Sequence, residues 1–239
     1  MRVYKALTPL QALSFDLDDT LYPNQPIILA AEHAMQRQLQ QQIGLAEFNT
    51  PEYWALQRRE LAIERPDIKH DVSRWRLLAV ERGLQAQGWT ACAAAEIAEV
   101  ALMAFLAVRT RIVLPVGVRP LLQQLAARWP LIAITNGNAD LSQMGIADLF
   151  QFSLRAGPDG RMKPSPDLFV HAAHRLQIPT SSILHIGDHV DSDVKGALNA
   201  GCQACWLNLA PQQPSRLKVL PHLEISQLES LKNLLKLHG

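Results

Sequence analysis

The chain has few cysteines, almost no net charge and no long apolar run. Its 239 residues include three cysteines, too few for a disulfide framework, and 23 basic against 22 acidic side chains. That charge balance gives no bulk attraction to nucleic acid or to an anionic membrane. No run approaches the roughly 18 apolar residues of a membrane span, and the N-terminal segment lacks an apolar stretch followed by a small-residue cleavage site. We therefore expect a cytoplasmic protein without nucleic-acid or membrane partners. A monomer is compatible with the sequence, which leaves the oligomeric state open.

Two of the cysteines, Cys202 and Cys205, form a CxxC pair. A zinc site needs about four ligands, and no second CxxC or nearby CxxH accompanies this pair. A redox pair is expected at the start of a helix, where the thiolate is stabilised, whereas GCQACWLNL is typical of a turn glycine followed by a buried strand. We expect two small buried side chains here, with no reactive or metal-binding role.

Short apolar runs alternate with helical patterns over most of the chain. Strands are predicted at 13–15, 131–134, 183–186 and 205–207, with weaker candidates at 152–154 and 223–225. The segments GVRPLLQQLAARW, SPDLFVHAAHRLQ and SDVKGALNAG show the apolar spacing of helices, and SQLESLKNLLKL predicts a closing helix. This alternation predicts an α/β fold, a Rossmann-like parallel sheet with helices on both faces.

From residue 23 to residue 109 the pattern is helical throughout. Pro26 and Pro51 suit first-turn positions, and Asp71 and Thr90 suit N-caps. A helical block of roughly 90 residues is far too long for a loop. We predict an all-helical cap domain at 23–109, inserted into a sheet domain formed by 1–22 and 110–239.

Polar side chains follow the predicted strands, at the edge where parallel sheets bind ligands. Asp16, Asp18 and Asp19 crowd together in FDLDDT after the first strand, and crowded carboxylates repel one another unless a cation, a proton or hydrogen-bond donors hold them. Each such residue alone is as readily a turn residue or a solvated charge. Together they predict a site where something positive meets the acids. The remaining candidates in chain order are Thr135, Asn136, Lys163, Asp188 and Asp193.

These segments resemble the four ordered motifs of the haloacid dehalogenase-like (HAD) hydrolase superfamily. DLDDT matches the first motif, DxDxT, and Thr135 matches the Ser or Thr that closes the second strand. Lys163 in KPSPDLF matches the third motif, and GDHVDSD matches the fourth, GDxxxxD. The resemblance covers the whole chain, and the helical block after the first motif is similar to the C1 cap of that superfamily.

The resemblance implies phosphoryl transfer that depends on Mg²⁺. Asp16, the Asp18 carbonyl and Asp188 would hold the ion, with Asp193 as a direct or water-mediated support. Asp16 would be the nucleophile and would form an aspartyl-phosphate. Asp18 would protonate the leaving oxygen and then activate water.

Three further residues are implied to act on the phosphoryl group. Thr135 and the Asn136 backbone would bind its oxygens, and Lys163 would neutralise both Asp16 and the transferring group.

Asp18 favours a phosphatase or phosphomutase over a dehalogenase, because a departing alkoxide needs a proton and a halide does not. His189 stands where the resembling motif commonly has serine. It is a candidate substrate contact or, equally, a surface histidine without a role.

In the predicted cap, HDVSRWR supplies Arg74 and Trp75 as candidate contacts to a polar, ring-bearing substrate. The alternative is that Trp75 is a core residue and Arg74 faces solvent.

The chain also resembles a bacterial branch of the superfamily, the YigB-type phosphatases. The stretches that carry this resemblance are FDLDDTLY, HDVSRWR, ITNGNA, LRAGPDGR and LPHLEIS. That implies 5-amino-6-(5-phospho-D-ribitylamino)uracil and FMN, from riboflavin biosynthesis, as small-molecule substrates. A sugar phosphomutase, a broad-specificity sugar or nucleotide phosphatase, a degenerate HAD binding module and a receiver-like phospho-acceptor domain are the alternatives.

Overall fold

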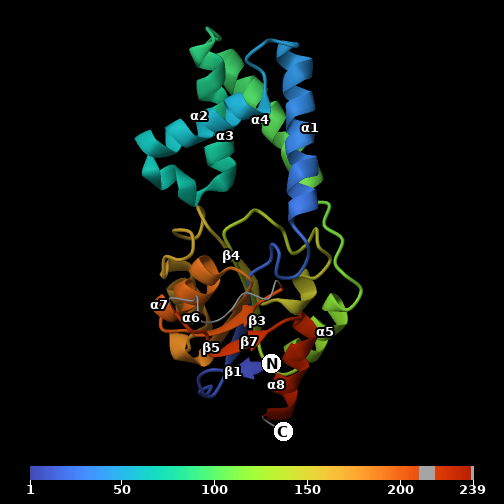
Figure 1. Cartoon of the computed structure of the whole chain (residues 1–239), viewed down its shortest axis with the longest axis vertical. Coiled ribbons are helices and arrows are strands. Elements are labelled where there is room, and N and C mark those ends of the chain that lie inside the picture. Colours follow the sequence, from blue (N-terminus) through green and yellow to red (C-terminus); the bar gives the residue numbers. More distant parts are fainter. Residues whose placement is uncertain (210–218, 238–239) are drawn as a thin grey trace. The chain divides into compact units, whose positions relative to one another are not determined.

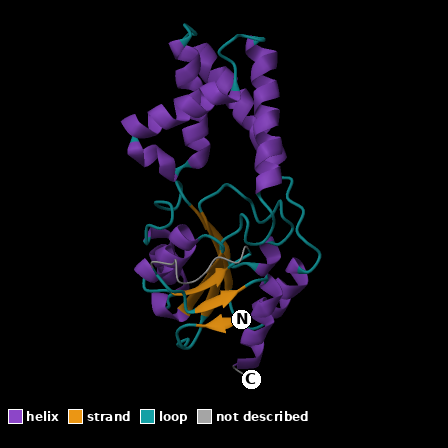
Figure 2. Ribbon diagram, viewed as in Figure 1, coloured by secondary structure: helices purple, strands orange, loops and turns teal. Residues whose placement is uncertain are grey.

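The computed structural model of the chain describes residues 1–209 and 219–237. The chain divides into two compact units, Met1–Pro23 with Val113–Gly239, and Asn24–Ile112. We call these the sheet unit and the helical unit. Figure 2 shows strands only in the sheet unit, while the helical unit contains helices and their connections. The division falls at Pro23–Asn24 and Ile112–Val113, against predicted boundaries at 22–23 and 109–110.

The sheet unit is built on a seven-stranded sheet with the order β1-β7-β6-β5-β2-β3-β4. All neighbouring strands are parallel except β1, which pairs antiparallel with β7. The predicted parallel α/β fold is therefore confirmed. The sequence did not predict β1, because it consists of two exposed residues with no apolar pattern. The strands are β1 (Arg2–Val3), β2 (Ala12–Phe15), β3 (Leu131–Thr135), β4 (Phe152–Arg155), β5 (Ile183–Gly187), β6 (Gln203–Leu207) and β7 (Leu223–Ile225).

Helices cover both faces of this sheet, which is why its central strands are apolar on both sides. Figure 1 shows α6 (Asp167–Leu176) and α7 (Gly196–Asn199) on one side, with α5 (Val118–Ala126) and α8 (Lys232–Leu237) on the other. The α6 side packs Ile134, Phe169 and Trp206 into one apolar cluster. The shorter helical turns of the unit are η2 (Ala147–Leu149), η3 (Thr180–Ser182), η4 (Val190–Lys195) and η6 (Leu228–Leu231).

The segment SDVKGALNAG departs from its prediction as one continuous α-helix. It begins with η4, a π-helical turn, and only then continues as α7. The side chain of His189 accepts a hydrogen bond from the Ser192 amide at the start of η4, and the Asp193 carboxylate accepts one from the His189 amide. These local bonds hold the wider turn, a geometry that often marks functional sites.

The helical unit contains α1 (Gln25–Ile43), α2 (Pro51–Glu64), η1 (Pro66–His70), α3 (Val72–Ala86) and α4 (Ala91–Arg109). The predicted caps are confirmed, because the Asp71 and Thr90 side chains accept hydrogen bonds from the Arg74 and Ala93 amides. In the packing of the unit, α1 lies on α4, α4 on α3 and α3 on α2.

Helix α4 is long and apolar enough to cross a membrane by length and composition, although the sequence has no unbroken run of about 18 apolar residues. Its 19 residues include an 18-residue window of mean hydropathy 2.0, although Glu96 and Glu99 interrupt the apolar run. The core helix of a soluble protein can have the same length and composition. Here α4 packs against α1 and α3, and Ala98 and Phe105 belong to the core of the helical unit.

The CxxC pair is buried, as predicted. Cys202 and Cys205 are free thiols inside the sheet unit, and burial raises the pKa of each to about 12.

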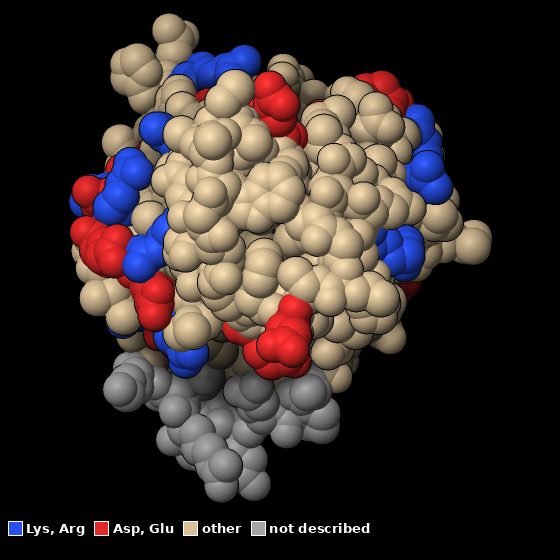
Figure 3. Space-filling view, turned by 90° about the horizontal axis from the view of Figure 1, so that it is seen from above, with Lys and Arg blue, Asp and Glu red and all other residues tan. Residues whose placement is uncertain are grey.

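Acidic and basic side chains are interspersed around the face in Figure 3, in keeping with the net charge of +1.

Candidate active site

The predicted site residues of the sheet unit meet at the carboxyl ends of the strands. Asp16 directly follows β2, Thr135 ends β3, Asp188 directly follows β5, and Asp193 lies in η4. They line a cavity of about 190 Å³. The predicted residues that border this cavity are Asp16, Asp18, Thr135, Asn136, Lys163, Asp188, His189 and Asp193.

Lys163 is the central cation of this group and is 1% exposed. Its Nζ donates to Asp16 Oδ1, to Asp193 Oδ1 and to the Ile134 carbonyl, each at 2.7 Å. An ammonium has three donors, so all of them are used and its position is fixed. The Asn136 side chain pairs with the Lys163 backbone in both directions, at 2.7 and 2.9 Å. The motif resemblance implied only a backbone role for Asn136, and this side-chain contact was not predicted.

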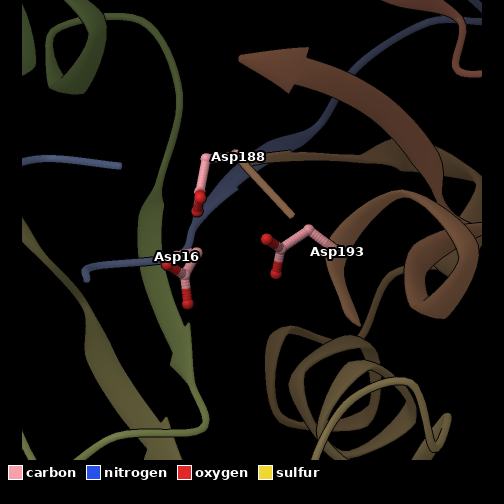
Figure 4. Close-up of side chains that lie close together, drawn as sticks. All are labelled: Asp16, Asp188 and Asp193. Carbon is pink, nitrogen blue, oxygen red and sulfur yellow. The ribbon is translucent and has the colours of Figure 1, made fainter. Parts of the chain in front are cut away.

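Three carboxylates converge beside the lysine. Figure 4 shows those of Asp16, Asp188 and Asp193 gathered around one space, and one oxygen of each lies within 4.8 Å of the others. Thr20 Oγ1 lies between two of them, 3.3 Å from Asp16 Oδ2 and 3.1 Å from Asp188 Oδ1. Carboxylate oxygens are the ligands that a hard divalent cation such as Mg²⁺ prefers. This donor set therefore fits a metal ion.

The pKa shifts show that the cluster is short of positive charge. Burial raises the pKa of Asp16 to about 8, since the opposing effect of Lys163 is smaller and Asp193 adds to the rise. Burial likewise raises the pKa of Asp188. Burial also acts to raise the pKa of Asp193, but Lys163 and His185 outweigh it and hold that pKa below its usual range. Lys163 therefore favours the ionised form of Asp193. The Asp16 carboxyl keeps its proton until a bound cation takes the place of that proton.

Asp18 lies on a tight turn after Asp16 and accepts a hydrogen bond from the Tyr22 hydroxyl. A backbone bridge also joins Asp18 to Tyr22. Asp19 has φ 57°, in the left-handed region that aspartate tolerates better than most residues. The backbone conformation of this turn is reason enough for an aspartate at position 19, so no chemical role is needed for it. The same turn leaves Asp18 beside the cavity.

Ser14 and His185 extend the polar network into the sheet and were missed by sequence reasoning. They are register partners on β2 and β5, and Ser14 Oγ lies 2.8 Å from His185 Nδ1. His185 Nε2 lies 3.3 Å from Asp193 Oδ1. Because burial lowers the pKa of His185 to about 4, the ring is neutral near pH 7. It then donates from Nε2 to the carboxylate and accepts from Ser14 at Nδ1. The available signal was a polar residue inside each of two apolar strands.

His185→Leu should lower turnover by roughly tenfold or more, the usual cost of removing a partner that orients a ligand. The substitution leaves Ser14 without its acceptor and Asp193 without one donor. His185→Gln keeps an amide donor and should recover part of the loss. The measurement is kcat and the half-saturating Mg²⁺ concentration for both variants, with the melting temperature as a check on folding. Equal activity of both variants and the wild type would show that His185 only fills space.

The other predicted contacts fall outside this cluster or take structural roles. His189 is exposed and borders the cavity, but its ring nitrogen Nδ1 caps η4. Trp75 is half-buried and its Nε1 donates to the Arg58 carbonyl at 2.8 Å, while Arg74 is exposed. Trp75 and Arg74 belong to the helical unit. Their contact with substrate stays a prediction.

A comparison with known families identifies this arrangement. The profile of the haloacid dehalogenase-like hydrolases matches residues 10–201. The chain belongs to this family. Its match includes β2, the whole helical unit and every predicted site residue.

Individual relatives agree with the family match. The 5-amino-6-(5-phospho-D-ribitylamino)uracil phosphatase YigB of Escherichia coli is 44% identical over 243 residues, covering 98% of this chain and 100% of the relative. The structure of a 2-haloacid dehalogenase from Pseudomonas syringae is 33% identical with a TM-score of 0.88, covering 96% of this chain and all of that one. The magnesium-bound HAD-hydrolase YfnB of Bacillus subtilis shares the fold at 23% identity and a TM-score of 0.63, over 95% and 99% of the two chains. The predictions of an HAD-like hydrolase and of a phosphatase are confirmed.

Proposed function

We propose that this HAD-like hydrolase is a Mg²⁺-dependent phosphatase that acts on a small phosphorylated metabolite through an aspartyl-phosphate at Asp16. The observation that carries this proposal is the Asp16 carboxylate, held 2.7 Å from Lys163 Nζ beside two further acids and two positions before Asp18. Asp16, the Asp18 carbonyl and Asp188 are the proposed magnesium ligands, with Asp193 as a direct or water-mediated support beside them. The proposed setting is the cytoplasm.

The proposed reaction has two steps. An Asp16 oxygen attacks phosphorus, the ester P–O bond breaks, and the Asp18 carboxyl gives its proton to the departing oxygen. The Asp18 carboxylate then takes a proton from water, whose oxygen attacks phosphorus. The bond to Asp16 breaks, and inorganic phosphate leaves. Thr135 and the backbone amide of Asn136 hold the phosphoryl oxygens, and the charge of Lys163 offsets that of Asp16 beside them. Bound Mg²⁺ would neutralise the phosphoryl charge.

The proposed substrates are 5-amino-6-(5-phospho-D-ribitylamino)uracil and FMN, supported by 44% identity over nearly the full chain to the E. coli phosphatase. Phosphate release should be compared across these two compounds, sugar phosphates and nucleotides. The highest kcat/KM is expected for the ribitylamino-uracil phosphate. A tenfold preference for a sugar phosphate would favour the broad-specificity alternative. Conversion of a sugar phosphate without release of phosphate would identify a mutase.

A second candidate, 2-haloacid dehalogenase, is favoured by the 33% identical structure of that name. Asp18 separates the two reactions, because a departing halide takes no proton. We expect no halide release from 2-chloropropionate under conditions where an aryl phosphate is hydrolysed. Halide release without phosphatase activity would reverse this assignment.

Removal of divalent metal should abolish phosphatase activity, because the single positive charge of Lys163 cannot balance the three clustered carboxylates. The measurement is hydrolysis of an aryl phosphate after treatment with EDTA and after re-addition of Mg²⁺. Recovery with Mg²⁺ is expected, since carboxylate oxygens suit it. Full activity in EDTA would contradict the proposed metal site.

A further inference from the structure

The helical unit contains a cavity of about 410 Å³ that is separate from the cluster of acids. It lies between α1, α2 and α3, and all the residues that line it belong to the helical unit. Since α1 packs on α4 and α2 packs on α3, no extensive contact joins α1 to α2 within this fully described unit. A volume stays open between them, and its size is typical of small-molecule sites.

The walls of this cavity are mostly apolar. Met35 and Leu39 on α1, Trp54 on α2 and Val80 on α3 border it, and all four belong to the buried core of the helical unit. Core side chains are held by their neighbours. The cavity therefore has a firm apolar surface that suits a flat or ring-bearing molecule.

A charged group stands in the wall of the same cavity. Glu32 Oε1 accepts hydrogen bonds from Arg58 Nη1 at 3.1 Å and from Arg76 Nη2 at 2.5 Å. Among the residues in the described ranges, Glu32 is the only acid that pairs with either arginine. Two guanidinium groups thus share one carboxylate, which leaves one positive charge without a matching acid.

That excess charge is largely withdrawn from water. The side chains of Arg58 and Arg76 are 29% and 11% exposed. Arg76 lies over the Phe105 ring at 3.8 Å, and its Nε is buried without a hydrogen-bond partner. Burial lowers the pKa of Arg76, because it outweighs the opposing effect of Glu32. Buried charges normally have partners, and guanidinium groups favour carboxylate and phosphate oxygens.

We propose that this cavity is a binding site for a small molecule that carries an anionic group on a flat apolar body. The anion pairs with Arg58 and Arg76, and the apolar body lies against Trp54 and its neighbours. Glu52 also borders the cavity, but it is exposed and pairs with neither arginine in the described structure. Such a ligand has two sources, the leaving group of the substrate or a separate effector.

The test measures direct binding of 1-naphthoate and of its neutral analogue 1-naphthamide to the full chain by calorimetry. Because no turnover is involved, its failure and failure of the proposed phosphatase activity are separate results. The anion should bind about tenfold more tightly than the amide, the ratio expected for one favourable charged contact. Arg58→Gln should remove that difference, whereas Glu52→Gln should keep or increase it. Equal affinity of the two probes for the wild type would overturn the proposal.

A second pair of variants tests the place of binding. Ala55 borders the cavity from an exposed position on α2, so Ala55→Trp fills the opening without entering the core. Ala86→Trp makes the same change at an exposed position on α3 that does not border the cavity. Ala55→Trp should abolish binding of both probes and Ala86→Trp should not, with both variants folded by circular dichroism. Unchanged binding to Ala55→Trp, or no binding to the wild type at millimolar probe, would refute the site.

Inhibition of aryl phosphate hydrolysis by 1-naphthoate distinguishes the two possible ligands, the leaving group of the substrate and a separate effector. Competitive inhibition that Arg58→Gln relieves assigns the site to the leaving group of the substrate. Non-competitive inhibition or activation that Arg58→Gln relieves assigns it to a separate effector. Either pattern supports the site, and inhibition that Arg58→Gln leaves unchanged contradicts it.

Discussion

Asp16→Asn should reduce phosphate release from an aryl phosphate by roughly four orders of magnitude or more, as expected when a covalent nucleophile is lost. An amide oxygen does not attack phosphorus, and the substitution also removes one of the three clustered carboxylates. The asparagine oxygen can still accept from Lys163, so the local packing is expected to survive. Initial rates under saturating Mg²⁺, with the mass of the purified variant checked for deamidation back to aspartate, provide the measurement.

The melting temperature gives an independent readout of the same change. The pKa of Asp16 is raised to about 8 in the folded state. At pH 7 the metal-free folded state therefore binds a proton that the unfolded state releases, and this costs stability. The neutral amide removes that cost, so Asp16→Asn should be at least as stable as the metal-free wild type. Asp191→Asn, an exposed change of the same kind on η4, should alter neither activity nor stability. A stable Asp16→Asn with wild-type turnover would exclude Asp16 as the nucleophile.

The strands and the main acids were predictable because they depend on simple patterns. Strands buried on both faces are apolar runs, and parallel strands bring their carboxyl ends to one edge. That rule placed Asp16, Thr135 and Asp188 together although they are far apart in the chain. The motif resemblance added Lys163, whose three donors the structure then accounts for.

Contacts that depend on register and rotamer were not predictable. Ser14 meets His185 across 171 positions only because β2 and β5 align at that residue pair, and no local pattern fixes that alignment. The contact between the Asn136 side chain and the Lys163 backbone was also not predictable, because that side chain could have pointed into the cavity instead. In the helical unit, the sequence predicted helices throughout but not which pairs of helices would pack. The cavity between α1 and α2 follows from that packing.

Asp18→Asn should slow alkyl phosphates by about 10²- to 10⁴-fold, the usual contribution of general acid–base catalysis. p-Nitrophenyl phosphate should keep its first step, because p-nitrophenolate departs without a proton. The second step still needs Asp18 to activate water. The variant should therefore release a burst of p-nitrophenol equal to one equivalent of enzyme and then turn over slowly, which stopped-flow absorbance can follow.

Two further readouts separate the acid–base role of Asp18 from metal binding. The expected metal ligand at this position is the backbone carbonyl, which Asp18→Asn retains, so the half-saturating Mg²⁺ concentration should not change. Tyr22→Phe removes the hydroxyl that donates to Asp18 and should shift the dependence on leaving group in the same direction, by a smaller factor. Equal slowing of alkyl and aryl phosphates without a burst would instead mean that Asp18 acts on binding or folding. In that case the match of Asp18 to the first motif would carry no information about the leaving group. Asp18 would then no longer argue against a dehalogenase.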